Sequence, residues 1–133
     1  MLTYRKGVDF MAIYESGETY LETILILQNK MGAVRSIDVA NELGYSKPSV
    51  SRAMGILKKA EYIVIEGNGN IILTEKGKQK AAEIFNRHKI ITEFLMKSLD
   101  INENTASVDA CRIEHVISEE VFVRMTEYIT RRK

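Results

Sequence analysis

Two short helical segments joined by a tight turn, over residues 36–59, constrain the fold more than any other feature of the sequence. Ser36 can cap a first helix over residues 37–43, and Gly44 suits the left-handed conformation that often ends a helix. Pro48 lies in the first turn of a second helix, where the missing proline N–H is not needed. The apolar residues of this second helix recur at i, i+3, i+4 and i+7, namely Val50, Ala53, Met54 and Leu57. The pattern predicts a helix-turn-helix, with a plain helical hairpin of a bundle as the alternative.

The segment after Ala60 changes from helical to strand periodicity. Residues 62–65 and 71–73 are rich in residues that favour strands, and residues 66–70 between them include an Asn-Gly pair. This arrangement predicts a β-hairpin. A hairpin directly after a recognition-type helix is the wing of a winged helix, so it favours a winged helix over the bundle.

Four further helices are predicted from caps and apolar periodicity. Ser16 can cap a helix that Gly32 ends, and Thr74 can cap a long helix. Another helix begins near Asn102, and Ser118 can cap the last one. The long helix carries an apolar stripe that includes a histidine and consists of Ala81, Ile84, Phe85, His88, Ile91 and Leu95.

The chain is therefore predicted to be mainly α-helical, with two domains. A winged helix-turn-helix DNA-binding domain covers residues 1–75, of which 1–15 are an N-terminal extension. A helical domain for metal binding and dimerisation covers residues 76–133. Its three amphipathic helices exceed what a compact winged helix needs, and surplus apolar stripes in such a chain usually build a dimer interface. We therefore expect a homodimer.

Composition places the chain among soluble globular proteins. Its 133 residues are 45% hydrophobic and 28% charged. No apolar run is long enough to cross a bilayer, and nothing after Met1 resembles a signal peptide. The single cysteine excludes an internal disulfide. A cytoplasmic location without a membrane partner is expected.

Charge is distributed unevenly, although the net charge is only +1. Residues 44–60 contain four basic residues and no acidic one. Residues 98–120 contain six acidic residues against Arg112 alone. The basic segment suggests a polyanionic partner, and the acidic segment suggests a cation.

Cys111, Glu114 and His115 are spaced i, i+3 and i+4, which places their side chains on one face if the segment is helical. A thiolate, a carboxylate and an imidazole can hold a first-row transition metal, and His88 offers a second imidazole. The mixture suits Fe²⁺, Co²⁺, Ni²⁺, Zn²⁺ or, less comfortably, Mn²⁺. One alternative is a buried cysteine beside a surface glutamate and histidine. Another is a catalytic Cys–His pair, which would lack an orienting acid beyond Glu114 and a glycine-rich oxyanion turn.

Five short motifs follow one another along the chain. They are residues 16–24 (SGETYLETI), 46–51 (SKPSVS), 73–77 (LTEKG), 87–88 (RH) and 109–115 (DACRIEH). Together they resemble the diphtheria-toxin-repressor family of metal-dependent transcriptional repressors, which has iron- and manganese-responsive branches. The resemblance implies a winged-helix DNA-binding domain, a helical dimerisation domain and a metal corepressor.

The resemblance also implies a ligand set, from which this chain departs in places. It puts metal ligands at Thr19, Glu22, His88, Cys111, Glu114 and His115. Thr19 stands where the iron branch has methionine and the manganese branch aspartate, and it is a poor ligand that would act through water. Cys111 follows the iron branch, whereas Glu22 follows the manganese branch. Thr92 and Ser107 replace ligands of the family's ancillary site, so that site is expected to be absent, as is the SH3-like third domain of longer members.

We therefore predict a metal-dependent repressor that senses Fe²⁺ or Mn²⁺ and binds a palindromic double-stranded DNA operator as a homodimer. Co²⁺, Ni²⁺ or Zn²⁺ would substitute in vitro, and neither a catalytic residue nor a small-molecule substrate is expected. Base contacts are predicted for Ser46, Pro48, Ser49, Ser51 and Arg52, and phosphate contacts for Lys47, Lys76 and Lys78. The alternative is a metal-independent winged-helix regulator with a vestigial metal site.

Overall fold

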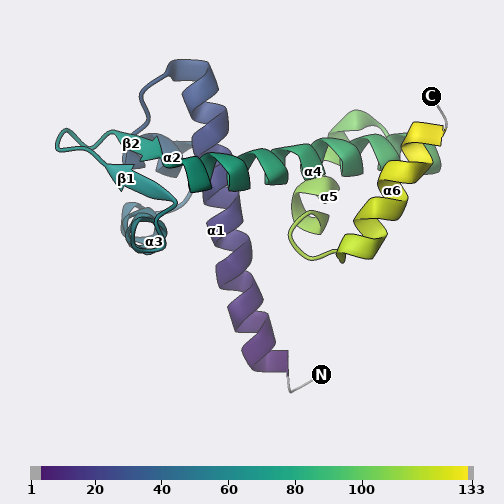
Figure 1. The fold of residues 1–133 in the computed structure, drawn as a ribbon, viewed down its shortest axis with the longest axis horizontal. Helices are drawn as coiled ribbons and strands as arrows, with labels where there is room; N and C mark the ends of the chain where they lie inside the picture. The colour runs from purple at the N-terminus through teal and green to yellow at the C-terminus, as the bar shows by residue number, and fades with distance from the viewer. Residues whose placement is uncertain (1–3, 132–133) are drawn as a thin grey trace. The chain divides into compact units, whose positions relative to one another are not determined.

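The computed structural model describes residues 4–131, with side chains from residue 17 onward. This part of the chain contains six α-helices and one two-stranded antiparallel sheet (Figure 1). The elements are α1 (Tyr4–Met31), α2 (Ser36–Leu43), α3 (Lys47–Lys59), β1 (Ile63–Ile65), β2 (Ile71–Leu73), α4 (Glu75–Leu99), α5 (Glu103–Ile113) and α6 (Glu119–Arg131). A first compact unit ends at Ala82 and a second begins at Glu83, within α4. The predicted mainly α-helical fold is confirmed.

The helix α1 is continuous over 28 residues and ends at Met31, directly before Gly32, whose φ of 82° is left-handed. The predicted N-cap at Ser16 is wrong, because Ser16 lies in the middle of α1. Serine or glycine in a helix interior costs only about 0.5–1 kcal/mol relative to alanine, so the Ser16-Gly17 pair does not interrupt a packed helix. The expected extension is part of α1 from Tyr4 onward, and residues 1–3 lie outside the described residues.

Helices α2 and α3 form the predicted helix-turn-helix. Gly44 has a φ of 70° and a ψ of 27°, the left-handed conformation expected at this position. Ser46 caps α3 through its Oγ, which accepts a backbone N–H of the first turn at 3.3 Å. The predicted cap at Ser36 is wrong by one residue. Arg35 takes the cap position because the Asp38 carboxylate accepts the Arg35 backbone N–H at 2.9 Å.

Strands β1 and β2 form the predicted wing, with Val64 opposite Ile72. The Ile71 N–H donates to the Val34 carbonyl at 2.7 Å, and the Asn70 side-chain oxygen accepts the Val34 N–H at 3.1 Å. These two hydrogen bonds attach the hairpin to the segment between α1 and α2.

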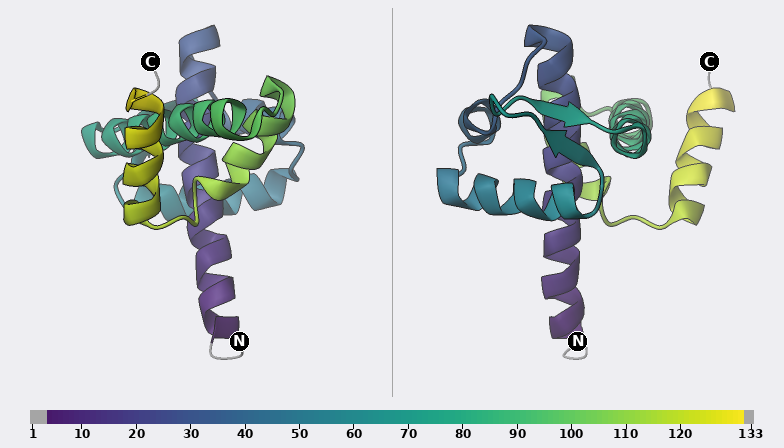
Figure 2. Two further views of the ribbon diagram at one scale, coloured as in Figure 1. Left: turned by 90° about the vertical axis from the view of Figure 1, so that its right-hand side faces the viewer. Right: turned by 60° about the vertical axis from the view of Figure 1, so that its left-hand side comes forward.

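Helices α1, α2 and α3, the hairpin and the start of α4 lie together in the first unit (Figure 2), and their buried side chains form one hydrophobic core. Helix α1 packs against α2, α3 and β2. The side chains at the centre of this core are fully buried and include Ile24, Val34, Val39, Val50, Ile71 and Ala81. Each buried valine or isoleucine side chain contributes roughly 1.5–3 kcal/mol. The core therefore holds α3 by its apolar face and leaves the opposite face of α3 exposed.

The start of α4 requires a glycine. Thr74 caps the helix as predicted, since its Oγ1 accepts the Gly77 N–H at 3.0 Å and donates to the Glu61 carbonyl at 2.7 Å. A Cβ at Gly77 would lie 2.0 Å from the Tyr62 carbonyl oxygen. Only a residue without a side chain allows this approach between α4 and the residue directly before β1.

Residues of α4, α5 and α6 share a second, smaller core. Its buried members are Ile91, Leu95, Ala106 and Ala110. Asn102 caps α5, and Ser118 caps α6 as predicted, because its Oγ accepts a first-turn N–H at 3.1 Å. Phe85 was predicted in the buried stripe but is 37% exposed. It lies about 100° around the helix from the buried Ile84, at the edge of the stripe. None of the described helices is both long enough and apolar enough to cross a membrane.

Candidate metal centre and nucleic-acid interface

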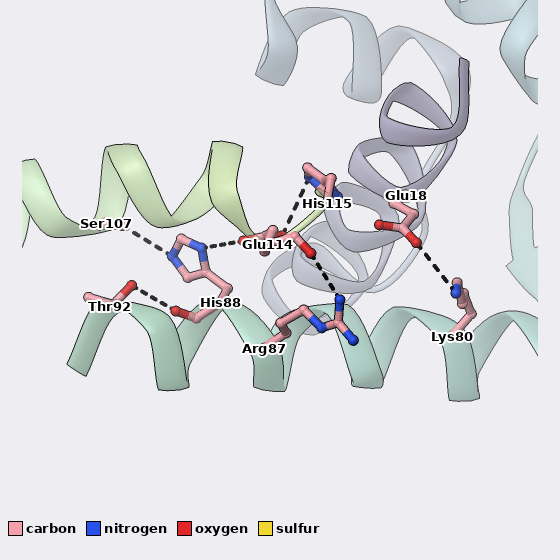
Figure 3. Close-up of polar contacts among 8 residues, drawn as sticks. All are labelled: Glu18, Lys80, Arg87, His88, Thr92, Ser107, Glu114 and His115. Atoms are coloured by element: carbon pink, nitrogen blue, oxygen red, sulfur yellow. Dashed lines mark hydrogen bonds and ion pairs between the residues drawn. The ribbon is translucent and has the colours of Figure 1, made fainter. Parts of the chain in front are cut away.

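A half-buried histidine and a fully buried glutamate of the second unit form a close pair (Figure 3). His88 comes from α4, and Glu114 follows the last residue of α5. The His88 Nδ1 lies 2.7 Å from the Glu114 Oε1. The Glu114 side chain is 0% exposed, and the His88 side chain is 20% exposed. The pair therefore offers an imidazole nitrogen and a carboxylate oxygen at the protein interior.

The second carboxylate oxygen of Glu114 is buried, and it has no hydrogen-bond partner among the described residues. The nearby His115 Nε2 lies 3.6 Å from this Oε2, which is too long for a hydrogen bond. A buried charged group with an unsatisfied oxygen costs several kcal/mol unless a cation or a donor compensates it. Imidazole and carboxylate are suitable ligands for divalent first-row metals, so these residues fit a metal ion.

Other side chains hold the pair in place. Arg87 donates to the Glu114 backbone carbonyl at 3.3 Å and pairs with the Glu119 carboxylate at 3.0 Å. The Ser107 Oγ lies 3.2 Å from the His88 Nε2. Sequence reasoning assigned no role to Arg87 and treated Ser107 only as a lost ligand. The only signal for Arg87 is its position directly before the histidine.

Helix α5 ends at Ile113, and Glu114 at its C-cap keeps a helical backbone conformation, with its N–H donating to the Ala110 carbonyl at 2.9 Å. Residues 114–116 form a turn, in which Glu114 and His115 are buried while Cys111 remains exposed on the last helical turn. Among the predicted ligands of the second unit, the structure thus brings His88, Glu114 and His115 together. A role for the Cys111 thiol stays a prediction.

The two remaining predicted ligands lie on α1 in the first unit. Glu22 is 7% exposed, and Thr19 one turn before it is partly buried. Glu18, directly before Thr19 on α1, is also buried, and its carboxylate pairs with Lys80 of α4 at 3.4 Å (Figure 3). Glu22 is thus a buried carboxylate of the first unit, and its role as a ligand stays a prediction.

The predicted DNA-contacting residues are all exposed. They lie at the N-terminal end of α3 and in the first turn of α4, and comprise Ser46, Lys47, Pro48, Ser49, Ser51, Arg52, Lys76 and Lys78. The Lys76 Nζ donates to the Ala60 carbonyl at 2.9 Å and lies 4.5 Å from the centre of the Tyr62 ring. The Lys76 amine is therefore already engaged within the protein.

Sequence reasoning did not single out Arg35, an exposed cation beside the wing. The Arg35 guanidinium donates to the Asn68 carbonyl, and a Cβ at Gly69 would lie 3.3 Å from its Nε. Residues 66–70 of the wing contain no basic side chain, so Arg35 brings a positive charge to this hairpin.

A winged helix with an exposed basic recognition helix, followed by helices that bury a His–Glu pair, defines a DNA-binding regulator with a metal site. Two family models match. The model described as "Iron dependent repressor, N-terminal DNA binding domain" covers residues 12–71, and "Iron dependent repressor, metal binding and dimerisation domain" covers residues 74–133.

Curated relatives agree. An uncharacterised helix-turn-helix transcriptional regulator of Methanocaldococcus jannaschii is 32% identical over 120 residues, which are 90% of this chain and 96% of the relative. The helix-turn-helix transcriptional regulator MntR of Geobacillus thermodenitrificans is 32% identical over 114 residues, which are 86% of this chain and 80% of that protein. The chain belongs to the diphtheria-toxin-repressor family of metal-dependent transcriptional regulators, as the motifs predicted. The matched domains and relatives are those of DNA-binding regulators, not of enzymes.

Solved structures show the same fold. A manganese-dependent transcriptional repressor in complex with manganese has a TM-score of 0.80 at 22% identity, and the alignment covers 86% of this chain and 52% of that one. The T. acidophilum IdeR structure has a TM-score of 0.76 at 24% identity, covering 85% of this chain and 53% of that one. The chain thus spans about half the length of these solved chains.

Proposed function

We propose that this chain is a repressor that senses Fe²⁺ or Mn²⁺ and binds a palindromic operator as a homodimer in the cytoplasm. The observation that supports the metal most strongly is the buried Glu114 carboxylate. One of its oxygens contacts His88, and the other has no hydrogen-bond partner in the described part of the chain. A divalent cation would compensate this oxygen, and it would act as the corepressor expected in this family.

The proposed ligands are His88, Glu114 and His115, together with Glu22. The proposal for the first three rests on the close approach of the two imidazoles to the Glu114 carboxylate in the second unit. Glu22 rests on its buried carboxylate and on the resemblance of its motif. Cys111 and Thr19 complete the proposed set on the resemblance of their motifs, since the Cys111 thiol is exposed and a threonine hydroxyl is a weak ligand that would act through water.

The choice between iron and manganese follows from the ligand types. Carboxylates suit Mn²⁺, imidazoles suit either metal, and a thiolate would favour Fe²⁺. The Cys111 thiol is exposed, and whether it binds the metal decides the preference between Fe²⁺ and Mn²⁺. We propose that the protein responds to both metals and that Cys111 sets their order.

The proposed DNA contact uses the exposed N-terminal half of α3 in the major groove, with Ser46, Ser49 and Arg52 nearest the bases. Lys47 and Lys78 would contact phosphates. Two copies of α3 related by a two-fold axis would read a palindrome, as in other dimeric helix-turn-helix proteins. Residues 1–75 form the proposed DNA-binding half, and residues 76–133 form the metal-binding and dimerisation half.

Metal can affect DNA binding if it selects a conformation of the dimer that fits the operator. Glu22 precedes the helix-turn-helix in the chain, whereas the other proposed ligands follow the wing. A metal bound by ligands from before the helix-turn-helix and from after the wing would narrow the range of spacings between the two recognition helices of the dimer. Such coupling between two binding sites is typically worth about 1–3 kcal/mol.

The experiment is an operator-binding titration. The operator is first selected from randomised DNA with purified protein and Mn²⁺ or, without oxygen, Fe²⁺. Fluorescence anisotropy then measures operator affinity in chelator and with Fe²⁺, Mn²⁺, Co²⁺ or Zn²⁺. We expect a gain of about 5–150-fold with metal. Equal affinity with and without every metal would favour a metal-independent regulator instead.

Variants test whether the metal-dependent gain in operator affinity depends on the proposed ligands. We expect Glu114→Gln to abolish the gain and Glu22→Gln to reduce it while dimerisation and weaker metal binding persist. The matched control is Glu103→Gln, an exposed glutamate in the first turn of α5. If Glu22→Gln keeps the full gain, the metal acts within the second unit alone.

A further inference from the structure

Each ring nitrogen of His88 faces a different partner (Figure 3). The Nδ1 lies 2.7 Å from the Glu114 carboxylate, and the Nε2 lies 3.2 Å from the Ser107 Oγ on α5. Thr92 also contacts this histidine, but through the His88 backbone carbonyl at 2.8 Å. Ser107 is therefore the residue that engages the far side of the imidazole ring.

From this arrangement we propose that Nδ1 is the metal-binding atom of His88 and that Ser107 is a positioning residue for the ring. The inference rests on the proposed function and adds which nitrogen binds and what orients it. The nitrogen beside a proposed carboxylate ligand is the one available to a shared cation. The nitrogen beside the Ser107 hydroxyl is then free to carry the ring proton. Histidine ligands in metal sites generally donate their second N–H to such an oxygen.

A hydroxyl is well suited to this position because it can both donate and accept a hydrogen bond. When Nδ1 donates its proton to Glu114, the Ser107 hydroxyl can donate to the lone pair of Nε2. When Nδ1 uses its lone pair for a cation, Nε2 carries the proton and the same hydroxyl can accept it. Rotation about one C–O bond therefore satisfies the half-buried ring in both cases. An alanine would satisfy it in neither.

The inference predicts a loss of metal affinity when the hydroxyl is removed. Loss of a partner that orients a metal-binding histidine typically weakens binding about 10–100-fold. Ser107→Thr keeps a hydroxyl on the same atom position and should restore most of the affinity. The matched control is Ser98→Ala, because the Ser98 hydroxyl donates to the Phe94 carbonyl within α4 at 2.6 Å and not to His88.

The experiment uses the full chain and two measurements. Competition with a chromophoric chelator gives the Zn²⁺ affinity of the parent, Ser107→Ala, Ser107→Thr and Ser98→Ala. ¹⁵N–¹H correlation spectra of the imidazoles in the Zn²⁺-loaded parent and in Zn²⁺-loaded Ser107→Thr show which ring nitrogen carries a proton. The chain has two histidines, so the signals lost in His88→Gln assign the ring.

We expect the loaded parent and Ser107→Thr to show a protonated Nε2 and a metal-bound Nδ1 at His88. We expect a 10–100-fold loss of Zn²⁺ affinity in Ser107→Ala only. A metal-bound Nε2 in the parent, or unchanged affinity in Ser107→Ala, would overturn the inference while the proposed function stands. A parent in which Zn²⁺ moves no His88 signal would overturn both.

Discussion

Replacing Glu114 by glutamine should change the stability of the protein in opposite directions with and without metal. The side chain is 0% exposed, and its Oε2 lacks a hydrogen-bond partner among the described residues. An unsatisfied buried polar group costs about 1–3 kcal/mol, and more when it is charged. Removing the charge relieves part of this cost. It also exchanges a charge-assisted contact to His88 for a neutral one, a loss of roughly 1 kcal/mol. In chelator, Glu114→Gln should therefore be as stable as the parent or more stable by about 1 kcal/mol.

With metal, the order reverses. A cation present at 100 times its dissociation constant stabilises the parent by about 2.7 kcal/mol, and it should add almost nothing to Glu114→Gln. Urea denaturation followed by circular dichroism, in chelator and in Mn²⁺, gives the four free energies of unfolding. Glu103→Gln serves as the control and should follow the parent in both conditions. The reasoning is refuted if Glu114→Gln is clearly less stable than the parent in chelator and if Mn²⁺ raises its free energy of unfolding as much as it raises that of the parent.

Four other substitutions test separate parts of the structure. Gly77→Ala should lower the free energy of unfolding by about 1–3 kcal/mol in urea denaturation, because its Cβ would lie 2.0 Å from the Tyr62 carbonyl oxygen. Arg52→Ala should cost roughly 1–3 kcal/mol of operator affinity and relax sequence preference, whereas Lys78→Ala should weaken all sequences alike in anisotropy titrations. Cys111→Ser should handicap Fe²⁺, Co²⁺ and Zn²⁺ more than Mn²⁺, and an unchanged metal order would exclude the sulfur as a ligand.

Local chemistry made much of the fold predictable. Gly44, Ser46 and Thr74 each satisfy backbone groups at a helix end through the residue itself or its near neighbours, so the sequence alone identifies them. The predicted cap at Ser16 is wrong because local chemistry alone does not decide where a helix begins. A residue that can cap a helix is also tolerated inside one, and the packing of α1 in the first core outweighs its weak preference.

The site depends on contacts that sequence spacing does not contain. Cys111 and Glu114 are three residues apart, yet the first is exposed and the second is buried, because burial depends on what packs against each residue and not on spacing along the chain. Arg87 of α4 donates to the backbone carbonyl of Glu114, and such a long-range bond can fix where a helix stops. The proposed positioning role of Ser107 is likewise not contained in the sequence spacing, because it depends on the contact between its hydroxyl on α5 and His88 on α4.

The central claim is that metal and operator bind to one coupled system, and reciprocal linkage tests it most directly. The Mn²⁺ affinity of the full chain is measured by electron paramagnetic resonance of free Mn²⁺, without DNA and with saturating operator. If metal raises operator affinity by some factor, the operator must raise metal affinity by the same factor, expected to be about 5–150-fold. Identical Mn²⁺ affinities with and without operator, together with identical Fe²⁺ affinities under anaerobic conditions, would contradict the account.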